Sequence, residues 1–281
     1  MSSESVEWAR SRLAEAIQPF RPVALKLLNL ASGEFPPLKQ VADLLASDAV
    51  LMAQVLRLAN SPLLGRRIEI TDALQAVVYL GMDRINSLIV TTYMRSMITP
   101  ASGEWGGASW RHNLATAVIC EQCAKAIHIN RERGYLAGLL HDIGQLAMLH
   151  AFPDYAESLR EAAMEGRNTL AVERSLYGMD HAEVGGWLLS QWGCPPYLRT
   201  VAAHHENPPT AAGEEWDVVR LVGAASQAAE LIGFFVFPGS DRNELEKILE
   251  SVPELGAEID DLQEMTELVG SRINAIELIL G

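Results

Sequence analysis

A His-Asp pair inside an apolar stretch is the first candidate for chemistry in this sequence. Residues 136–149 are apolar nearly all round except for His141, Asp142 and Gln145, which predicts a buried helix. An ionised carboxylate beside an imidazole is costly in such surroundings unless it is paired, hydrogen-bonded or bound to a metal. The pair therefore needs partners, and either a structural hydrogen-bond network between helices or an internal metal site would supply them.

Other histidines favour a shared internal site. His112 begins one predicted helix, His181 begins another after an Asp180/Glu183 capping pair, and His204 and His205 end a third. Histidine and carboxylate side chains from several helices of a bundle are the usual components of a metal site.

The three cysteines give a much weaker signal. Cys120 and Cys123 have the spacing of a zinc knuckle, but no second pair lies nearby and their neighbours are apolar at helical spacing, which favours core thiols. Cys194 stands alone at a predicted helix end and does not indicate a nucleophile. So few, unevenly placed cysteines fit a reducing compartment, and we expect a cytoplasmic protein.

The elements that must position these residues all show helical spacing, which predicts an all-α protein. We expect short N-terminal helices that include 50–60 and 72–81, a Gly- and Ser-containing separator over 102–109, and helices over 110–129, 136–150, 152–165, 181–192 and 196–205. After Gly239 the chain becomes charged, and its last helix carries Ile259, Leu262, Val269, Ile273, Ile276 and Leu280 near heptad spacing. We expect this helix to dock on the core, although a dimer coiled coil stays open.

Composition excludes several classes of function. The 281 residues are 49% hydrophobic and carry a net charge of -14, so the chain can build a core but would repel a nucleic acid backbone. No apolar run reaches the length of a membrane span, and the charged N-terminal segment does not resemble a signal peptide.

The order of these motifs resembles a known family. His112, then residues 141–144 (HDIG), then residues 181–185 (HAEVG) and then residues 204–206 (HHE) look like the HD superfamily of metal-dependent phosphohydrolases, and especially its HD-GYP branch. The first third is more diagnostic. Residues 36–38 (PPL), 46–49 (ASDA), 58–62 (LANSP) and 73–82, which end in LGM, resemble the HDOD domain, an HD-related signalling module. The resemblance covers roughly residues 20–235.

The resemblance implies a single HDOD-type domain over 1–281. It would contain a helical-bundle N-terminal lobe (20–101) packed on an HD-like lobe (110–238), followed by a C-terminal helical extension (239–281). It also implies a ligand set for one divalent ion, iron, zinc or manganese, made of His112, His141, Asp142, His181, His204 and His205. Most HDOD domains are thought to have lost catalysis together with part of this set.

Three departures from the HD pattern weaken the case for catalysis. Ser226 stands where the superfamily expects a late Asp ligand, Gln145 stands where HD-GYP proteins have Lys, and Asn207-Pro208-Pro209 replaces the Gly-Tyr-Pro substrate loop. A hydroxyl is a poor replacement for a carboxylate that holds a divalent ion. Hydrolysis of cyclic-di-GMP is therefore not expected.

We therefore expect a bacterial signalling or scaffold module without catalytic residues of its own, which binds a protein partner or a nucleotide-type ligand. A homodimer through the last helix is a further possibility. The alternative is a divalent-metal-dependent phosphohydrolase that acts on a nucleotide or phosphoester, with His141 and Asp142 among the metal ligands. Neither nucleic acid nor membrane is an expected partner.

Overall fold

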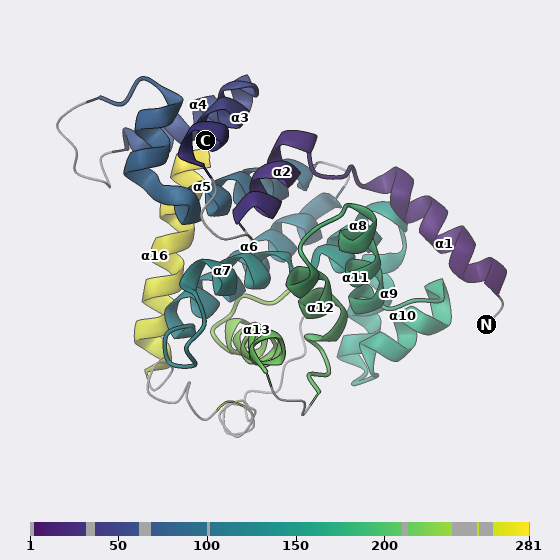
Figure 1. The fold of residues 1–281 in the computed structure, drawn as a ribbon. Coiled ribbons are helices and arrows are strands. Elements are labelled where there is room, and N and C mark those ends of the chain that lie inside the picture. The colour runs from purple at the N-terminus through teal and green to yellow at the C-terminus, as the bar shows by residue number, and fades with distance from the viewer. Residues whose placement is uncertain are drawn as a thin grey trace.

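The computed structural model describes residues 3–31, 37–61, 69–99, 102–209, 213–237, 252 and 261–280, and every regular element in these ranges is a helix (Figure 1). The predicted all-α class is confirmed. The helices are α1 (Ser3–Ala16), α2 (Pro22–Ala31), α3 (Leu38–Ala46), α4 (Ala49–Ala59), α5 (Ala73–Met97), α6 (Gly103–Cys123), α7 (Arg131–Leu140), α8 (Ile143–Ala151), α9 (Tyr155–Met164), α10 (Thr169–Tyr177), α11 (His181–Gln191), α12 (Pro196–His204), α13 (Glu214–Leu231) and α16 (Leu262–Leu280). Among the described helices, none combines the length and apolar character needed to cross a lipid bilayer.

Among helices α2–α5, called here the N-terminal helices, α4 and α5 begin at side-chain hydrogen bonds. Asp48 caps α4 by accepting from the backbone N–H groups of Val50 and Leu51, as its position before an apolar run predicts. After α4, the Asn60 carboxamide accepts from the backbone N–H of Ile70 at 2.8 Å and donates to the Ile70 carbonyl at 2.8 Å. Asn60 therefore ties the end of α4 to the start of the segment that leads into α5. Pro36 and Pro62, which belong to the motifs that resemble the HDOD domain, lie outside the described residues.

Gly81 interrupts α5, as the sequence predicts for the end of a helix. Its backbone has φ 76° and ψ 164°, in a region that glycine adopts without a Cβ clash, and a second helical stretch continues from there to Met97. As a whole, α5 packs on α2, α3 and α4, and it also contacts α7. The long second stretch of α5 was missed from the sequence, because a helix was expected to stop at Gly81.

Helices α6–α13 are called here the central helices. Within this group α6 packs on α7 and α13, and α11 packs on α8 and α12 (Figure 1). Two helix bounds here correct the sequence-based predictions. The expected separator over 102–109 is helical, because α6 already begins at Gly103. The expected single helix over 136–150 is broken, with α7 ending at Leu140 and α8 beginning at Ile143. One continuous apolar core extends from α1 to α16.

The C-terminal helix α16 docks on this core. It runs along one side of the molecule against α4 and α6 (Figure 1), and it buries Met265, Val269 and Ile273. Arg57 of α4 donates to the carbonyls of Ile279 and Leu280, the carbonyls at a helix end that lack partners within the helix. The apolar stripe of the last helix is thus used within the chain. Ile259 lies outside the described residues.

Candidate metal centre

The break between α7 and α8 places the His-Asp pair. His141 follows the last residue of α7 and Asp142 precedes the first residue of α8, so both side chains lie at a corner rather than along one helix face. Close packing of glycines fixes this corner. A Cβ on Gly144 would lie 1.9 Å from the carbonyl oxygen of His181, and one on Gly138 would lie 2.8 Å from the Cα of Ala117. Glycine at these two positions therefore lets the corner approach α11 and α6 at backbone distance.

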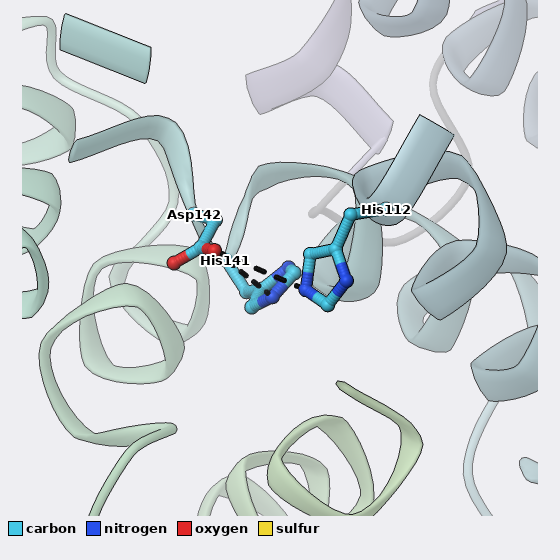
Figure 2. Close-up of side chains that lie close together, drawn as sticks. All are labelled: His112, His141 and Asp142. Atoms are coloured by element: carbon cyan, nitrogen blue, oxygen red, sulfur yellow. Dashed lines mark ion pairs between the residues drawn. The ribbon is translucent and has the colours of Figure 1, made fainter. Parts of the chain in front are cut away.

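Four histidines point their Nε2 atoms toward the Asp142 carboxylate. The distances from Nε2 to the nearer carboxylate oxygen are 3.9 Å for His112, 3.8 Å for His141, 3.4 Å for His181 and 3.2 Å for His205. Figure 2 shows His112 and His141 beside Asp142, with their ion-pair contacts dashed. All five residues are buried. The structure thus brings these five residues of the predicted ligand set together.

The opposite ring nitrogen of each histidine is held by an acceptor. Nδ1 donates to the carbonyl of Phe234 at 2.7 Å in His112, of Gly138 at 2.7 Å in His141 and of Ala202 at 3.1 Å in His205. A neutral imidazole that donates through Nδ1 has a lone pair on Nε2. These carbonyls therefore aim three lone pairs at the Asp142 carboxylate, as outer partners do in metal sites.

His181 is held by a buried acid instead of a carbonyl. Its Nδ1 donates to Glu173 Oε2 at 2.9 Å, and its backbone N–H donates to the same oxygen at 3.0 Å. Tyr155 also donates to this carboxylate. Asp180 and Glu183 form the predicted capping box at the start of α11. Glu173 and Tyr155 were missed from the sequence, because nothing in α9 or α10 marks them apart from ordinary helix residues.

The mixture of buried acids and imidazoles shifts their pKa values strongly. Burial lowers the pKa of His141 to about 3, which keeps this ring neutral. Burial also opposes charge on His181, but the carboxylates of Glu173 and Asp142 outweigh it and raise the pKa well above its usual value. Burial would raise the pKa of Asp142, yet the surrounding imidazoles hold it well below its usual range. Without a metal, the site therefore combines an anionic Asp142 with protonated imidazole.

Glu206 adds a second carboxylate at the mouth of the site. Its Oε1 lies 3.2 Å from His181 Nε2 and 3.6 Å from His205 Nε2. Burial would raise the pKa of Glu206, but the hydrogen bond with His181 lowers it to about 2. The sequence pattern contained Glu206 directly after His205 but gave no reason to include it in the site.

His204 does not join the cluster, which corrects the predicted ligand set. It is the last residue of α12 and is exposed, and its ring lies 5.5 Å from that of Trp216. Neighbouring residues on a helix point about 100° apart, so only one of the two consecutive histidines can face the site. The three cysteines are buried and form no disulfide with one another. Burial raises the pKa of Cys194 to about 12 and the pKa of Cys120 well above its usual value, which disfavours a reactive thiolate at both positions.

The remaining donors fit a divalent ion. Two groups of close donor atoms share Asp142: His112 and His141 form one group with it, and His181 and His205 form the other. His141 Nε2 is buried without a hydrogen-bond partner, and the buried pair of His205 Nε2 and Asp142 Oδ1 lies at 3.2 Å without the geometry of a hydrogen bond. Imidazole and carboxylate are suitable ligands for iron, zinc and manganese, and unpaired buried donors of this kind are what a bound ion would satisfy.

Comparison with protein-family models identifies the family of this chain, because the model of the HDOD domain matches residues 17–208. The chain belongs to the HDOD family. The structure of an HDOD domain protein of unknown function from Geobacter sulfurreducens superposes with a TM-score of 0.73 at 23% identity, over 99% of this chain and 97% of the other.

Two further solved structures share the HDOD fold. One, from Marinobacter aquaeolei VT8, is provisionally named a signal transduction protein and gives a TM-score of 0.75 at 21% identity, over 99% of this chain and 64% of the other. The other, from Shewanella amazonensis SB2B, is provisionally named a metal-dependent phosphohydrolase and gives 0.57 at 23% identity, over 95% and 97%. An uncharacterized curated relative from Treponema pallidum is 25% identical over 228 residues, which is 78% of this chain but only 44% of that protein.

Proposed function

We propose that this HDOD protein is a non-catalytic signal-transduction module whose buried His/Asp centre binds one divalent ion. The ion would be held by Asp142, His181 and His205, with Glu206 beside them. Its role would be to hold α8, α11 and α12 together around the charged site, while a protein partner or a small ligand is bound elsewhere on the molecule.

Ser226 is the observation that carries this proposal. Its hydroxyl lies 3.2 Å from His112 Nε2, where it donates to the lone pair that a metal would need. Ser226 therefore fails to provide a carboxylate and also occupies the nitrogen of His112. The metal-binding capacity of the group of His112, His141 and Asp142 is therefore weakened. In the described residues, no hydroxyl donates to His205 Nε2 in the same way. A site that holds two ions would need the first group as well.

The pocket beside the centre also disfavours a phosphoester substrate. It has a volume of about 370 Å³, and besides Asp142 its lining contains Glu173, Glu206 and Glu230, against Arg167 and the imidazoles of His112 and His181. A phosphodiester carries negative charge and needs cations along its path. A single ion and one exposed arginine would leave this pocket acidic.

Metal analysis of protein purified without a His tag tests the proposal. We expect about one equivalent of iron, zinc or manganese, and a chelator should lower the melting temperature. The His205→Ala variant removes one of the proposed ligands and should lower the metal content. Protein without stoichiometric metal, and with a melting temperature that chelation does not change, would overturn the metal part of the proposal.

The second candidate is a metal-dependent phosphohydrolase, and the convergence of four imidazoles on Asp142 favours it. A bound divalent ion would supply Lewis-acid activation of water and phosphate there. A screen with p-nitrophenyl phosphate and bis(p-nitrophenyl) phosphate, in manganese, iron and zinc, separates the two functions. We expect no turnover above that of His141→Ala. Activity that disappears in this variant would favour the enzyme over the signalling module.

A further inference from the structure

A second pocket lies away from the metal centre, between the N-terminal helices and the central helices. Its volume is about 430 Å³, within the usual range for small-molecule sites. It is lined by residues of α2 and α5 on one side, and by the beginnings of α7 and α12 on the other. Because α5 and α7 pack directly on each other, a molecule in this pocket would contact both groups of helices.

Asn86 of α5 is an unusual residue to line this pocket. Its side chain is 1% exposed, and neither its carboxamide nitrogen nor its carboxamide oxygen has a hydrogen-bond partner. Buried carboxamides are nearly always paired, since the unpaired groups keep the cost of leaving water without compensation. A ligand with an acceptor beside a donor would satisfy both atoms at once, in the way that Asn reads the edge of adenine.

The opposite wall supplies a flat platform. The guanidinium of Arg133 lies 4.5 Å from the ring centroid of Tyr197, and both residues line the pocket. Leu28, Leu136 and Pro196 add apolar surface around this pair. Stacked arginine and aromatic planes bind the faces of planar heterocycles, whereas they offer little to a flexible aliphatic ligand.

The charges in the pocket do not favour a strongly charged ligand. Asp83 and Arg133 have opposite signs, and burial raises the pKa of Glu132 to about 8, so that Glu132 is largely neutral at physiological pH. The lining also contains Asn130, but its carboxamide oxygen already accepts from the backbone N–H of Arg133. The recognition groups are therefore the unpaired carboxamide of Asn86, one stacked pair and an apolar rim. This combination suits an uncharged planar ring better than a phosphate.

We propose that this pocket between α2, α5, α7 and α12 binds a nucleobase, with Asn86 pairing to its donor-acceptor edge and the Arg133–Tyr197 pair stacking on its face. This assignment rests on the signalling function proposed above, since it identifies the small ligand and the place where it is bound. Adenine is the ring to test first, because its amino group and the neighbouring ring nitrogen match the two free atoms of a carboxamide.

Calorimetric titration of the full chain with adenosine tests the proposal. We expect saturable binding that Asn86→Leu weakens roughly 5- to 150-fold, which is the range expected for the loss of a bidentate contact to a base. Purine riboside, which lacks the amino group, should bind more weakly than adenosine to the wild-type protein. Without ligand, Asn86→Leu should melt at the same or a higher temperature, because it removes an unpaired buried carboxamide.

Asn113 of α6 provides the matched control. It is also fully buried with both carboxamide atoms unpaired, but it does not line this pocket. The Asn113→Leu variant should therefore bind adenosine as the wild type does. If Asn86→Leu fails to fold, Tyr197→Leu replaces it, since it removes the platform and should weaken binding without touching Asn86.

Three outcomes would overturn the nucleobase site: no binding of adenosine by the wild-type protein, equal binding by Asn86→Leu, or binding that is lost in His141→Ala but kept in Asn86→Leu. The last result would place adenosine at the metal centre. The metal content of each sample, measured in parallel, separates this proposal from the metal site. Stoichiometric metal without adenosine binding would overturn only the nucleobase site.

Discussion

The two ends of α7 carry two carboxyl groups that respond to burial in opposite ways. Glu132 in its first turn has its pKa raised to about 8, because it is removed from water and its Oε2 receives only the Ser87 hydroxyl. Asp142, just beyond its last turn, has its pKa held well below the usual range, because imidazoles surround it. Burial raises the pKa in both cases, and the neighbouring groups decide which effect prevails.

This difference separates a candidate site from a buried acid. The imidazoles around Asp142 are themselves held by carbonyls and by Glu173, so its charge is balanced within a fixed frame. Glu132 has no comparable frame, and its Oε1 is buried without a partner. A perturbed pKa therefore indicates a binding centre only where the neighbours are positioned to share the charge.

The largest expected effect is that of Asp142→Ala. This substitution leaves the protonated imidazoles without their central anion, and breaking a buried ion pair on one side costs about 3–5 kcal/mol. We expect the free energy of unfolding of metal-free protein at pH 7 to fall by that amount, measured by urea denaturation. Asp43→Ala, which removes an exposed partner of Lys39, should change it by less than about 1 kcal/mol. Equal losses in the two variants would contradict the balance proposed for Asp142.

Glu173→Gln should have the next largest effect, on metal affinity. Glutamine keeps the size of the side chain but removes the anion that orients His181. Loss of such an outer partner lowers metal affinity by roughly 10- to 100-fold. Competition titration with zinc and a chromophoric chelator measures the change, and Glu157→Gln on the surface of α9 is the control. An affinity equal to that of the wild type would show that Glu173 serves the fold alone.

Ser226→Asp tests the other half of the centre. It would place a carboxylate next to His112 Nε2, where a hydroxyl now lies at 3.2 Å. We expect the metal stoichiometry to rise from one ion per chain toward two, since His112, His141 and Asp142 would regain a fourth ligand. Ser226→Ala frees His112 without adding a ligand and should keep one ion. A second ion in the alanine variant would mean that the hydroxyl alone blocks the first group.

Several helix boundaries could be predicted from the sequence, because their signals are local. Asp48, Asp72 and Asp180 each cap the helix that follows, and Gly81 breaks α5 as its type suggests. The boundary between α7 and α8 could not be predicted, because residues 136–149 have helical spacing and are apolar except for His141, Asp142 and Gln145. The break depends on backbone contacts of Gly138 and Gly144 with α6 and α11, which are far away in the sequence.

The candidate site was predictable where residue type was informative. Histidines on a buried face are rare enough to be noticed, and four of the five selected converge with Asp142. His204 was included because residues 204–206 (HHE) resemble the HD pattern, and the helical rotation between neighbours explains why it faces outward. Glu173 and Tyr155 lie on helices rich in acidic and polar residues, so only the tertiary structure distinguishes them from solvated side chains.

The smallest expected effect concerns Glu132, at the other end of α7 from Asp142. It tests whether the pKa values of these two carboxyl groups shift in opposite directions. A carboxyl group whose pKa rises from 4.5 to about 8 on folding binds its proton more tightly in the folded state. The free energy of unfolding should therefore fall as the pH rises from 4.5 to about 8 and then level off. Glu132→Gln keeps the acceptor for Ser87 but cannot ionise, so its stability should lose this dependence.

Wild-type protein and Glu132→Gln should accordingly differ little near pH 5 and most near pH 8.5. Because Glu132 lies at the edge of two pockets and water can reach part of its side chain, we expect the variant to gain only about 1–2 kcal/mol at the higher pH. Urea unfolding at pH 5, 7 and 8.5 measures the gain, with Asp43→Asn as the surface control. If the free energy of unfolding depended on pH in the same way for the wild type and Glu132→Gln, Glu132 would already be ionised. Its charge would then be balanced by its neighbours, as the charge of Asp142 is, and the carboxyl groups at the two ends of α7 would respond to burial alike.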